Sequence, residues 1–181
     1  MNRRFFLKQM LAFCAIPFVR RAWAETPVPA GAAPLAGHVA FAGVERIKKS
    51  PEAWQRLLSP EAYGVLFKEN TERSFSSPYN EEHRVGTFLC AACYNPLFSS
   101  DMKFDSGTGW PSFFRAIEGH TETKLDFKLI LPRTEYHCMR CGGHQGHRFN
   151  DGPPPTGQRW CNNGVALLFI PKGEPVPALR T

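Results

Sequence analysis

The sequence predicts a mainly β fold, built from antiparallel sheets and preceded by two short helices. Apolar and polar residues alternate through residues 124–131, which is the period of a strand with one buried face. A second apolar run covers residues 164–170 and ends before Pro171. Earlier in the chain, two serine–proline pairs precede apolar residues at helical spacing. The 181 residues, 43% of them hydrophobic, fit one domain with a single buried core.

The two helices are expected directly after Ser50 and Ser59. Each serine stands before a proline and a glutamate, the residue types that cap a helix and occupy its first turn. Apolar side chains then recur at helical spacing, and we expect them in the core: Trp54, Leu57, Leu58, Tyr63, Leu66 and Phe67.

From about residue 84 the pattern becomes that of strands and turns. Leu125, Phe127, Leu129 and Leu131 form the apolar side of the alternating segment. The run at residues 164–170 has the length of a buried strand. The 15 glycines and 16 prolines favour a loop-rich fold. Turn signals separate the segments, at Asn95-Pro96, Ser106-Gly107, Glu118-Gly119 and Asp151-Gly152-Pro153.

Residues 1–24 have the three parts of an export signal. A basic head is followed by an apolar run at residues 10–19 and by Ala22-Trp23-Ala24, which suits cleavage near Ala24. The head, Arg-Arg-Phe-Phe-Leu-Lys, is similar to a twin-arginine signal. Ten apolar residues are too few to span a bilayer, so we expect a periplasmic or otherwise exported protein without a permanent membrane anchor. A lipoprotein at Cys14 is the weaker alternative, because Phe13 is large where a small residue is needed.

The charge distribution argues against a nucleic-acid partner. Five of the 22 basic residues lie in residues 1–24, so 17 basic residues face 16 acidic ones in the rest, a net charge of +1. A nucleic-acid-binding zinc ribbon would need a basic patch. We expect a flexible, proline-rich leader at residues 25–43, the folded domain at residues 44–175 and a tail at residues 176–181.

Four cysteines form two Cys-x-x-Cys pairs, Cys90/Cys93 and Cys138/Cys141. Two such pairs supply the tetrahedral set of four thiolates that zinc prefers in structural sites. The 44 residues between the pairs exceed a zinc-ribbon gap, so the ion would join distant parts of the sheets. Two disulfides, a redox pair and a rubredoxin-like iron centre remain as alternatives.

Cys161 has no partner in this pattern. If residues 158–161 are extended, Arg159 and Cys161 point to the same face, and the guanidinium would lower the pKa of the thiol. Cys161 is therefore a candidate nucleophile, and a buried, inert cysteine is the alternative.

Further motifs surround this cysteine. They are Gly-Thr-Gly-Trp-Pro-Ser-Phe at residues 107–113, Cys-Gly-Gly-His-Gln-Gly-His-Arg-Phe at 141–149, Arg-Trp-Cys-Asn-Asn at 159–163, Ser-Ser-Pro-Tyr-Asn at 76–80 and Lys-Phe-Asp-Ser-Gly at 103–107. With the two cysteine pairs, they closely resemble the B-type methionine sulfoxide reductases, which act on the R epimer at sulfur. The resemblance runs from roughly Ser59 to Phe169.

The resemblance implies a twisted antiparallel fold of the β-tent (Mss4-like) type, one structural zinc ion on the four cysteines, and Cys161 as the catalytic nucleophile. A thiolate that attacks the sulfoxide sulfur needs a general acid for the departing oxygen. The implied acids are His144 and His147, with Asp151 orienting an imidazole or a water. The His-x-x-His pair could instead hold a metal.

The resemblance also implies the remaining site residues. Trp110 would pack against the methyl group on sulfur and select one epimer, although it could be a simple core residue. Asn163 would hydrogen-bond near the nucleophile, and Arg159 would help to activate it. Five positions depart from the family pattern and put substrate preference and efficiency in question: Gln145, Arg148, Trp160, Asn162 and Gly164.

Thr108 stands where many family members carry a second, resolving cysteine. We therefore expect an external thiol, from a thioredoxin-like protein or a small molecule, to reduce a Cys161 sulfenic acid. The expected substrate is an oxidised protein containing methionine-R-sulfoxide, with free methionine sulfoxide also possible, and the expected state is a monomer. The rival interpretation is an exported, zinc-stabilised binding module without catalysis.

Overall fold

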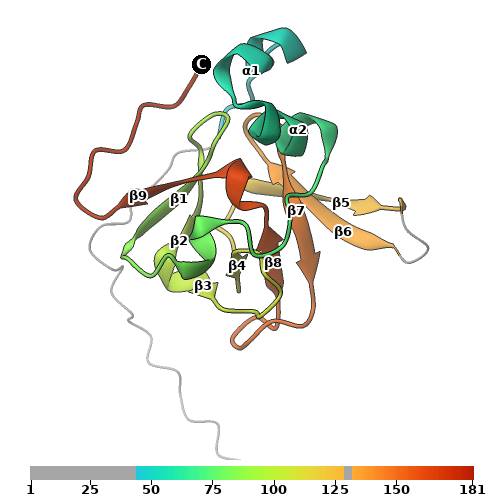
Figure 1. The fold of residues 1–181 in the computed structure, drawn as a ribbon, viewed down its shortest axis with the longest axis vertical. Coiled ribbons are helices and arrows are strands. Elements are labelled where there is room, and N and C mark those ends of the chain that lie inside the picture. The colour runs from blue at the N-terminus through green and yellow to red at the C-terminus, as the bar shows by residue number, and fades with distance from the viewer. Residues whose placement is uncertain (1–43, 129–131) are drawn as a thin grey trace, which may run out of the picture. The chain divides into compact units, whose positions relative to one another are not determined.

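The computed structural model describes residues 44–128 and 132–181, arranged as two antiparallel sheets and two short helices (Figure 1). The predicted signal and leader lie outside these residues. One sheet has three strands, in the order β2-β1-β9, and the other has six, in the order β3-β4-β8-β7-β6-β5. The mainly β prediction is confirmed. The strands are β1 Gly86–Cys90, β2 Pro96–Ser99, β3 Lys103–Phe104, β4 Ser112–Phe113, β5 Thr121–Asp126, β6 Arg133–Cys138, β7 His144–Phe149, β8 Arg159–Asn162 and β9 Leu167–Pro171.

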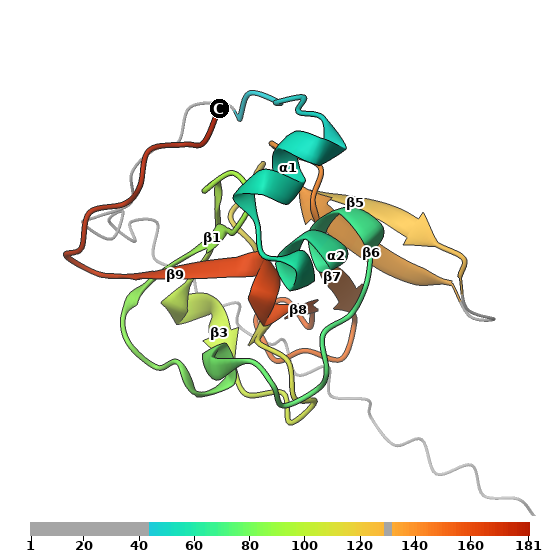
Figure 2. The same ribbon diagram turned by 45° about the horizontal axis from the view of Figure 1, so that its top comes forward.

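Both helices form where the serine–proline pairs predict them. Helix α1 is Pro51–Leu57 and α2 is Pro60–Lys68, and each capping serine accepts a hydrogen bond from the backbone N–H three residues on. Helix α2 packs against β7 and the short 3₁₀ helix η3, Gly164–Ala166 (Figures 1 and 2). Of the expected core residues, Leu57 is 44% exposed instead, because it lies at the last position of α1.

The core lies between the two sheets and is rich in aromatic side chains. Phe88 and Phe98 come from the small sheet, and Phe113 and Tyr136 come from the large one; all four are fully buried. The rings of Phe98 and Phe113 stack with their centroids 4.0 Å apart, which joins β2 to β4. The side chains on this face of the large sheet are therefore committed to packing, and the opposite face is left for polar groups.

Two strand predictions need correction. Strand β5 ends at Asp126, and Leu125 and Phe127 are 62% and 70% exposed, because the β5–β6 hairpin projects beyond the core in both ribbon views (Figures 1 and 2). The run at residues 164–170 begins with the turn η3, and β9 starts only at Leu167. The buried carboxylate of Glu72 accepts hydrogen bonds from the backbone N–H groups of Gly164 and Val165, and these bonds hold the turn out of the sheet.

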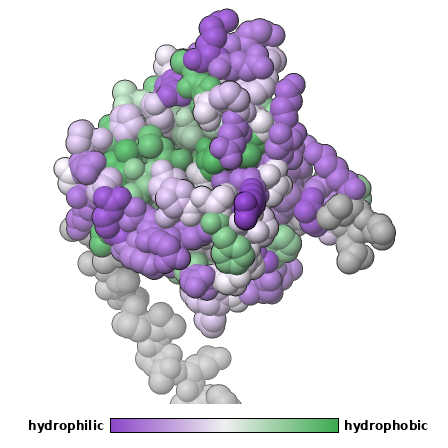
Figure 3. All heavy atoms as spheres, in the orientation of Figure 1, coloured by the Kyte–Doolittle hydropathy of each residue, from purple (hydrophilic) through white to green (hydrophobic). Residues whose placement is uncertain are grey.

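Hydrophilic residues cover most of the face seen in Figure 3, with hydrophobic residues in limited patches. None of the helices in the described part of the chain has the length and apolar character needed to cross a bilayer. Residues 176–181 form no helix or strand, but the backbone N–H of Arg180 donates to Cys93 O at 3.1 Å, so this segment contacts the first cysteine pair. The domain boundary at residue 175 stays a prediction.

Candidate active site and metal centre

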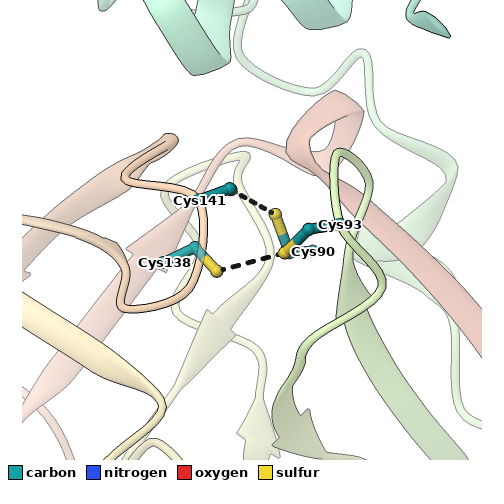
Figure 4. Close-up of side chains that lie close together, drawn as sticks. All are labelled: Cys90, Cys93, Cys138 and Cys141. Carbon is teal, nitrogen blue, oxygen red and sulfur yellow. Dashed lines mark hydrogen bonds between the residues drawn. The ribbon is translucent and has the colours of Figure 1, made fainter. Parts of the chain in front are cut away.

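The four paired cysteines meet between the two sheets. Cys90 ends β1 and Cys138 ends β6, and each is followed by a tight turn that returns the second cysteine to the first. Figure 4 shows the four side chains converging from these two turns. The sulfurs of Cys90 and Cys141 lie 3.7 Å apart, and those of Cys93 and Cys138 lie 3.5 Å apart. We call Cys90, Cys93, Cys138 and Cys141 the cysteine quartet.

The geometry of the quartet fits a tetrahedral metal ion. Four sulfurs at about 2.3 Å from zinc lie about 3.8 Å from one another, close to the observed separations. The four ligand atoms all lie within 4.8 Å of one another, and the cysteines are free. Burial raises the pKa of Cys90 well above its usual value, so a cation is needed to hold the set as thiolates. The side-chain amides of Asn95 and Gln145 donate toward the sulfurs of Cys138 and Cys90.

The fifth described cysteine lies in the middle of the large sheet. Strand β8 pairs with β4 on one side and β7 on the other, and Cys161 stands directly opposite Ser112 and His147. Directly opposed residues point to the same face, so the three side chains share the polar face of the sheet. Arg159 lies two residues earlier in the same strand and points to that face too, as the alternation predicts.

Arg159 is held by Asp151 and in turn acts on Cys161. Its Nε and one terminal nitrogen donate to the two carboxylate oxygens of Asp151, each at 2.9 Å. Burial raises the pKa of the Cys161 thiol, while the charge of Arg159 and hydrogen bonds from Thr108 and Arg159 act in the opposite direction. The predicted effect of the guanidinium is present, but burial outweighs it. The resting group at neutral pH is therefore the thiol, which needs a base to become a nucleophile.

The two histidines reach one face only because β7 is irregular. In a regular strand, residues three apart point to opposite faces. Between Tyr136 and His137 the pairing of β6 with β7 shifts by one residue, so that Tyr136 faces Gly146 and His137 faces His144. Gln145 is the extra residue of this bulge. The bulge places His144 and His147 on the face of Cys161, and it leaves the Gln145 amide to contact Cys90 at 3.4 Å.

Each imidazole is bonded to a buried carboxylate that the sequence analysis did not identify. His144 Nδ1 lies 2.5 Å from Glu135 Oε1, and His147 Nε2 lies 3.0 Å from Asp126 Oδ2. Hydrogen bonds from Lys128 N–H and His147 lower the pKa of Asp126 well below its usual range, so Asp126 is a carboxylate and His147 Nε2 carries the proton. Burial lowers the pKa of His144 to about 4 and keeps it neutral at pH 7. Asp151, expected beside an imidazole or a water, is bonded to Arg159.

Glu135, His137 and His144 also form a group whose ligand atoms converge within 4.8 Å. Two of its contacts are hydrogen bonds to a single oxygen, because His137 Nε2 also lies 2.9 Å from Glu135 Oε1. The ammonium group of Lys124 lies 3.3 Å from the other carboxylate oxygen. Lys124 already forms an ion pair with the Glu135 carboxylate. We therefore interpret Glu135, His137 and His144 as a hydrogen-bond cluster that orients His144, and not as a metal site.

The other predicted site residues lie around Glu72. The indole N–H of Trp110 donates to Glu72 O at 3.2 Å, and the Asn163 side chain accepts from Glu72 N–H at 3.0 Å. Asn163 also donates to Gln145 O at 3.0 Å, so both ends of its side chain are engaged. Trp110 borders a pocket of about 110 Å³ that is also lined by Phe75, Asn80, Glu81, Lys103, Phe104, Asp105, Gly107, Gly109 and Pro111.

The departures from the family pattern form contacts of their own. Trp160 and Arg148 pair across β8 and β7, with the guanidinium 5.6 Å from the ring centroid. Asn162 is buried and accepts a hydrogen bond from Tyr136 at 2.7 Å. The side chains of Arg148, Trp160 and Asn162 lie on the face of the sheet opposite Cys161. They therefore affect packing on that face more directly than they affect the polar face that carries the Cys161 side chain.

Comparisons with known proteins show which family the chain resembles. The SelR domain model matches residues 58–171. Three relatives are each named peptide methionine sulfoxide reductase MsrB. The protein from Bradyrhizobium diazoefficiens is 51% identical over 129 residues, 71% of this chain and 93% of the relative. The protein from Thiobacillus denitrificans is 49% identical over 125 residues, which cover 68% of this chain and 95% of the relative. The protein from Methanosarcina barkeri is 50% identical over 129 residues, which cover 71% of this chain and 91% of the relative. The chain therefore belongs to the family of B-type methionine sulfoxide reductases that share the SelR domain.

Proposed function

We propose that this protein, a peptide-methionine (R)-S-oxide reductase, acts through Cys161 as its nucleophile. The observation that carries the proposal is the placement of Cys161 opposite His147 and beside Arg159, on the polar face of the large sheet. The quartet cannot serve this purpose, because its thiols face one another. The non-catalytic binding module is not favoured, since it gives no reason for these groups to converge on a fifth cysteine.

The reaction transfers one oxygen atom between two sulfurs. Cys161 attacks the sulfoxide sulfur and forms a sulfur–sulfur bond. That bond and the sulfur–oxygen bond of the substrate then break while the oxygen bonds to the Cys161 sulfur, so the products are methionine and a sulfenic acid on Cys161. The thiol is oxidised by two electrons and the sulfoxide is reduced by two. The proton that leaves the thiol ends on the transferred oxygen, so a neutral imidazole can take it from sulfur and return it to oxygen. His147 and His144 are the proposed carriers, held by Asp126 and Glu135.

The substrate sulfur is proposed to rest against Trp110. An indole face accepts a methyl group well, and its N–H bond to Glu72 fixes the ring. Only one epimer can then present oxygen to the acid while its methyl group meets the ring. Arg159 is proposed to favour the thiolate form of Cys161, and Asn163 is proposed to hold the end of the strand that carries it.

An external thiol is proposed to reset the enzyme. Four of the six cysteines belong to the quartet and Cys14 lies in the predicted signal, so Cys161 has no further thiol to pair with. The sulfenic acid would condense with one external thiol to a mixed disulfide, releasing water, and a second thiol would free Cys161 and leave as a disulfide. A thioredoxin-like protein or a small thiol is the proposed donor. A stoichiometric disulfide between Cys161 and another cysteine of the same chain would contradict this step.

The quartet is proposed to hold one structural zinc ion. Its four sulfurs fit the tetrahedral set, and the ion would tie β1 of the small sheet to β6 of the large sheet. Metal analysis of the purified protein should find one zinc per chain. A monomer is proposed in solution, and light scattering at several concentrations tests it.

Export by the twin-arginine route is proposed from residues 1–24 alone. This route carries folded proteins, so the metal could be loaded before the quartet meets an oxidising compartment. Cell fractionation should find the wild-type chain in the periplasm, shortened near Ala24. The double change Arg3→Lys and Arg4→Lys should retain it in the cytoplasm, and unchanged export would contradict the proposal.

Single-turnover chemistry tests the proposed nucleophile. Without reductant, the enzyme should convert about one equivalent of a peptide R-sulfoxide to methionine and leave the S-sulfoxide unchanged. A sulfenic acid should then be trapped on Cys161 by a dimedone-type reagent. Cys161→Ser should abolish conversion while leaving metal content and folding unchanged. Conversion retained by this variant would overturn the assignment of Cys161.

A further inference from the structure

The backbone of Glu72 contacts two residues of the proposed site, Trp110 and Asn163. It lies between α2 and η1 (Pro78–Glu81) and is 5% exposed. Its carbonyl oxygen accepts from the indole N–H of Trp110, and its own N–H donates to the side-chain oxygen of Asn163. Trp110 precedes β4 and Asn163 follows β8, and the two strands are antiparallel, so Glu72 contacts both groups at the same end of the strand pair that carries Cys161.

The carboxylate of Glu72 fixes the turn that follows the nucleophile. Its two oxygens accept from the backbone N–H groups of Gly164, at 2.6 Å, and Val165, at 3.0 Å. A buried carboxyl group costs free energy unless it is hydrogen-bonded, and here burial raises its pKa while these two bonds act against that shift. The arrangement therefore depends on two bonds that only a group with two acceptor oxygens makes together.

The sequence of this chain accommodates the close contact. A Cβ atom added at Gly164 would lie 1.9 Å from Ser77 Oγ and 3.3 Å from Glu72 Oε1. A serine there, which the family pattern would supply, could fit only if Ser77 or the turn shifted. Gly164 is thus a departure with a structural reason, because it lets the turn approach Ser77 and Glu72.

We propose that Glu72 is a positioning residue that sets the orientation of Trp110 relative to Cys161, and with it the affinity for the sulfoxide and the discrimination between epimers. The proposal rests on the proposed function of Trp110 and Cys161. The indole orientation depends on one hydrogen bond to a carbonyl group, and that carbonyl group is held in place by three further bonds of the same residue. A small displacement of a substrate-positioning group is enough to lower both affinity and selectivity.

Glu72→Gln tests the proposal with little change in volume. The carboxamide has one acceptor oxygen, so its NH₂ group would face one of the two backbone N–H groups and displace the turn. We expect KM for a peptide R-sulfoxide to rise about tenfold, the cost of one unsatisfied buried group, and the R-to-S preference to fall. The alkylation rate of Cys161 by iodoacetamide should stay within about twofold, because the nucleophile itself is untouched.

Two comparisons separate positioning from a structural effect. Glu118→Gln, at an exposed position, should leave KM, the epimer preference and the melting temperature unchanged. Trp110→Phe keeps an aromatic ring but removes the N–H donor together with the five-membered ring of the indole, so it should raise KM and relax the epimer preference even if Glu72→Gln does not fold. In the double variant, the rise in KM should not exceed that of the larger single change.

Three results overturn the proposal: an unchanged epimer preference in Trp110→Phe, additive effects in the double variant, or a fall in kcat alone in Glu72→Gln. Each presupposes a wild-type enzyme that reduces the R-sulfoxide. An inactive wild-type enzyme would instead overturn the proposed function, so the two failures are distinguishable.

Discussion

The cysteine quartet and Cys161 place the same side chain in two different surroundings, with two different proposed roles, and exposure does not separate them. Cys141 of the quartet and Cys161 are both half-buried. Each quartet sulfur faces other sulfurs, whereas Cys161 faces Arg159, Thr108 and, across the strand pair, His147. The neighbours of a thiol therefore decide whether it becomes a metal ligand or a nucleophile.

The two regions also differ in how the backbone builds them. Each half of the quartet is a local turn of four residues at a strand end, and the halves come from different sheets. Cys161 lies within a central strand, and apart from Arg159 of the same strand, the groups near it come from neighbouring strands and a loop. A substitution in the quartet should thus destabilise the whole fold, while a substitution at Cys161 should lower activity without lowering stability.

The largest expected effect is on stability, from a change in the quartet. Cys138→Ser removes one of the four thiolates that would hold the proposed ion between the sheets, so we expect loss of bound metal and a fall of about 3–5 kcal/mol in the free energy of unfolding. Metal analysis and denaturant unfolding measure both. Cys161→Ser is the matched control and should keep the metal and the stability of the wild type. A Cys138→Ser protein with full metal content would contradict a structural role for the quartet.

The next effect connects the two regions through the backbone of β7. A Cβ atom added at Gly146 would lie 1.9 Å from the carbonyl oxygen of Cys161, and neither backbone can move aside inside the sheet. Gly146→Ala should cost about 2–3 kcal/mol of stability and slow single-turnover reduction. Gly64→Ala is the control, because its added methyl meets only the Asn70 side chain, which can shift. Equal stabilities of the two variants would show that the strands tolerate separation.

Local sequence was enough to predict the parts that depend on near neighbours. The helix caps at Ser50 and Ser59, the two cysteine turns and the shared face of Arg159 and Cys161 all follow from residues within a few positions of one another. The exposed Leu125 was not predicted, because the alternation shows which residues share a face but not whether the strand extends beyond the core.

The parts that depend on strand pairing could not be predicted. Nothing in residues 144–147 marks Gln145 as the extra residue of a bulge, because the shift is defined by the pairing with β6. Asp126 and Glu135 lie 21 and 9 residues from the histidines they contact, on strands whose order in the sheet was unknown. Glu72 contacts Trp110 and Asn163 through its backbone, which carries no residue-specific signal. A motif resemblance supplied the candidate site residues, and only the fold supplied the groups that hold them.

A smaller effect concerns the pH dependence of the free thiol. Because burial raises the pKa of Cys161, its alkylation rate should still increase as the pH passes the ordinary cysteine pKa of about 8.5. Thr108→Val removes a hydrogen bond that favours the thiolate, so the rate profile should move to higher pH and the rate at pH 8 should fall by about twofold to fivefold. The quartet, protected by its metal, should remain unlabelled throughout. A profile centred below the ordinary value would contradict the dominance of burial.

The smallest expected effect lies where the two regions touch. The Gln145 amide donates to the sulfur of Cys90, while its carbonyl oxygen Oε1 has no partner among the described residues. Gln145→Leu removes both the useful donor and the unsatisfied acceptor, so the free energy of unfolding should change by less than about 1 kcal/mol. Metal transfer to a chromophoric chelator should nevertheless accelerate by about twofold to tenfold, because groups behind the ligands tune the hold on the ion. Gln55→Leu, on the exposed side of α1, controls for the loss of an amide. Equal transfer rates in the two variants would mean that the bulge serves the histidines alone, and faster transfer only in Gln145→Leu would mean that one extra residue in β7 serves both regions.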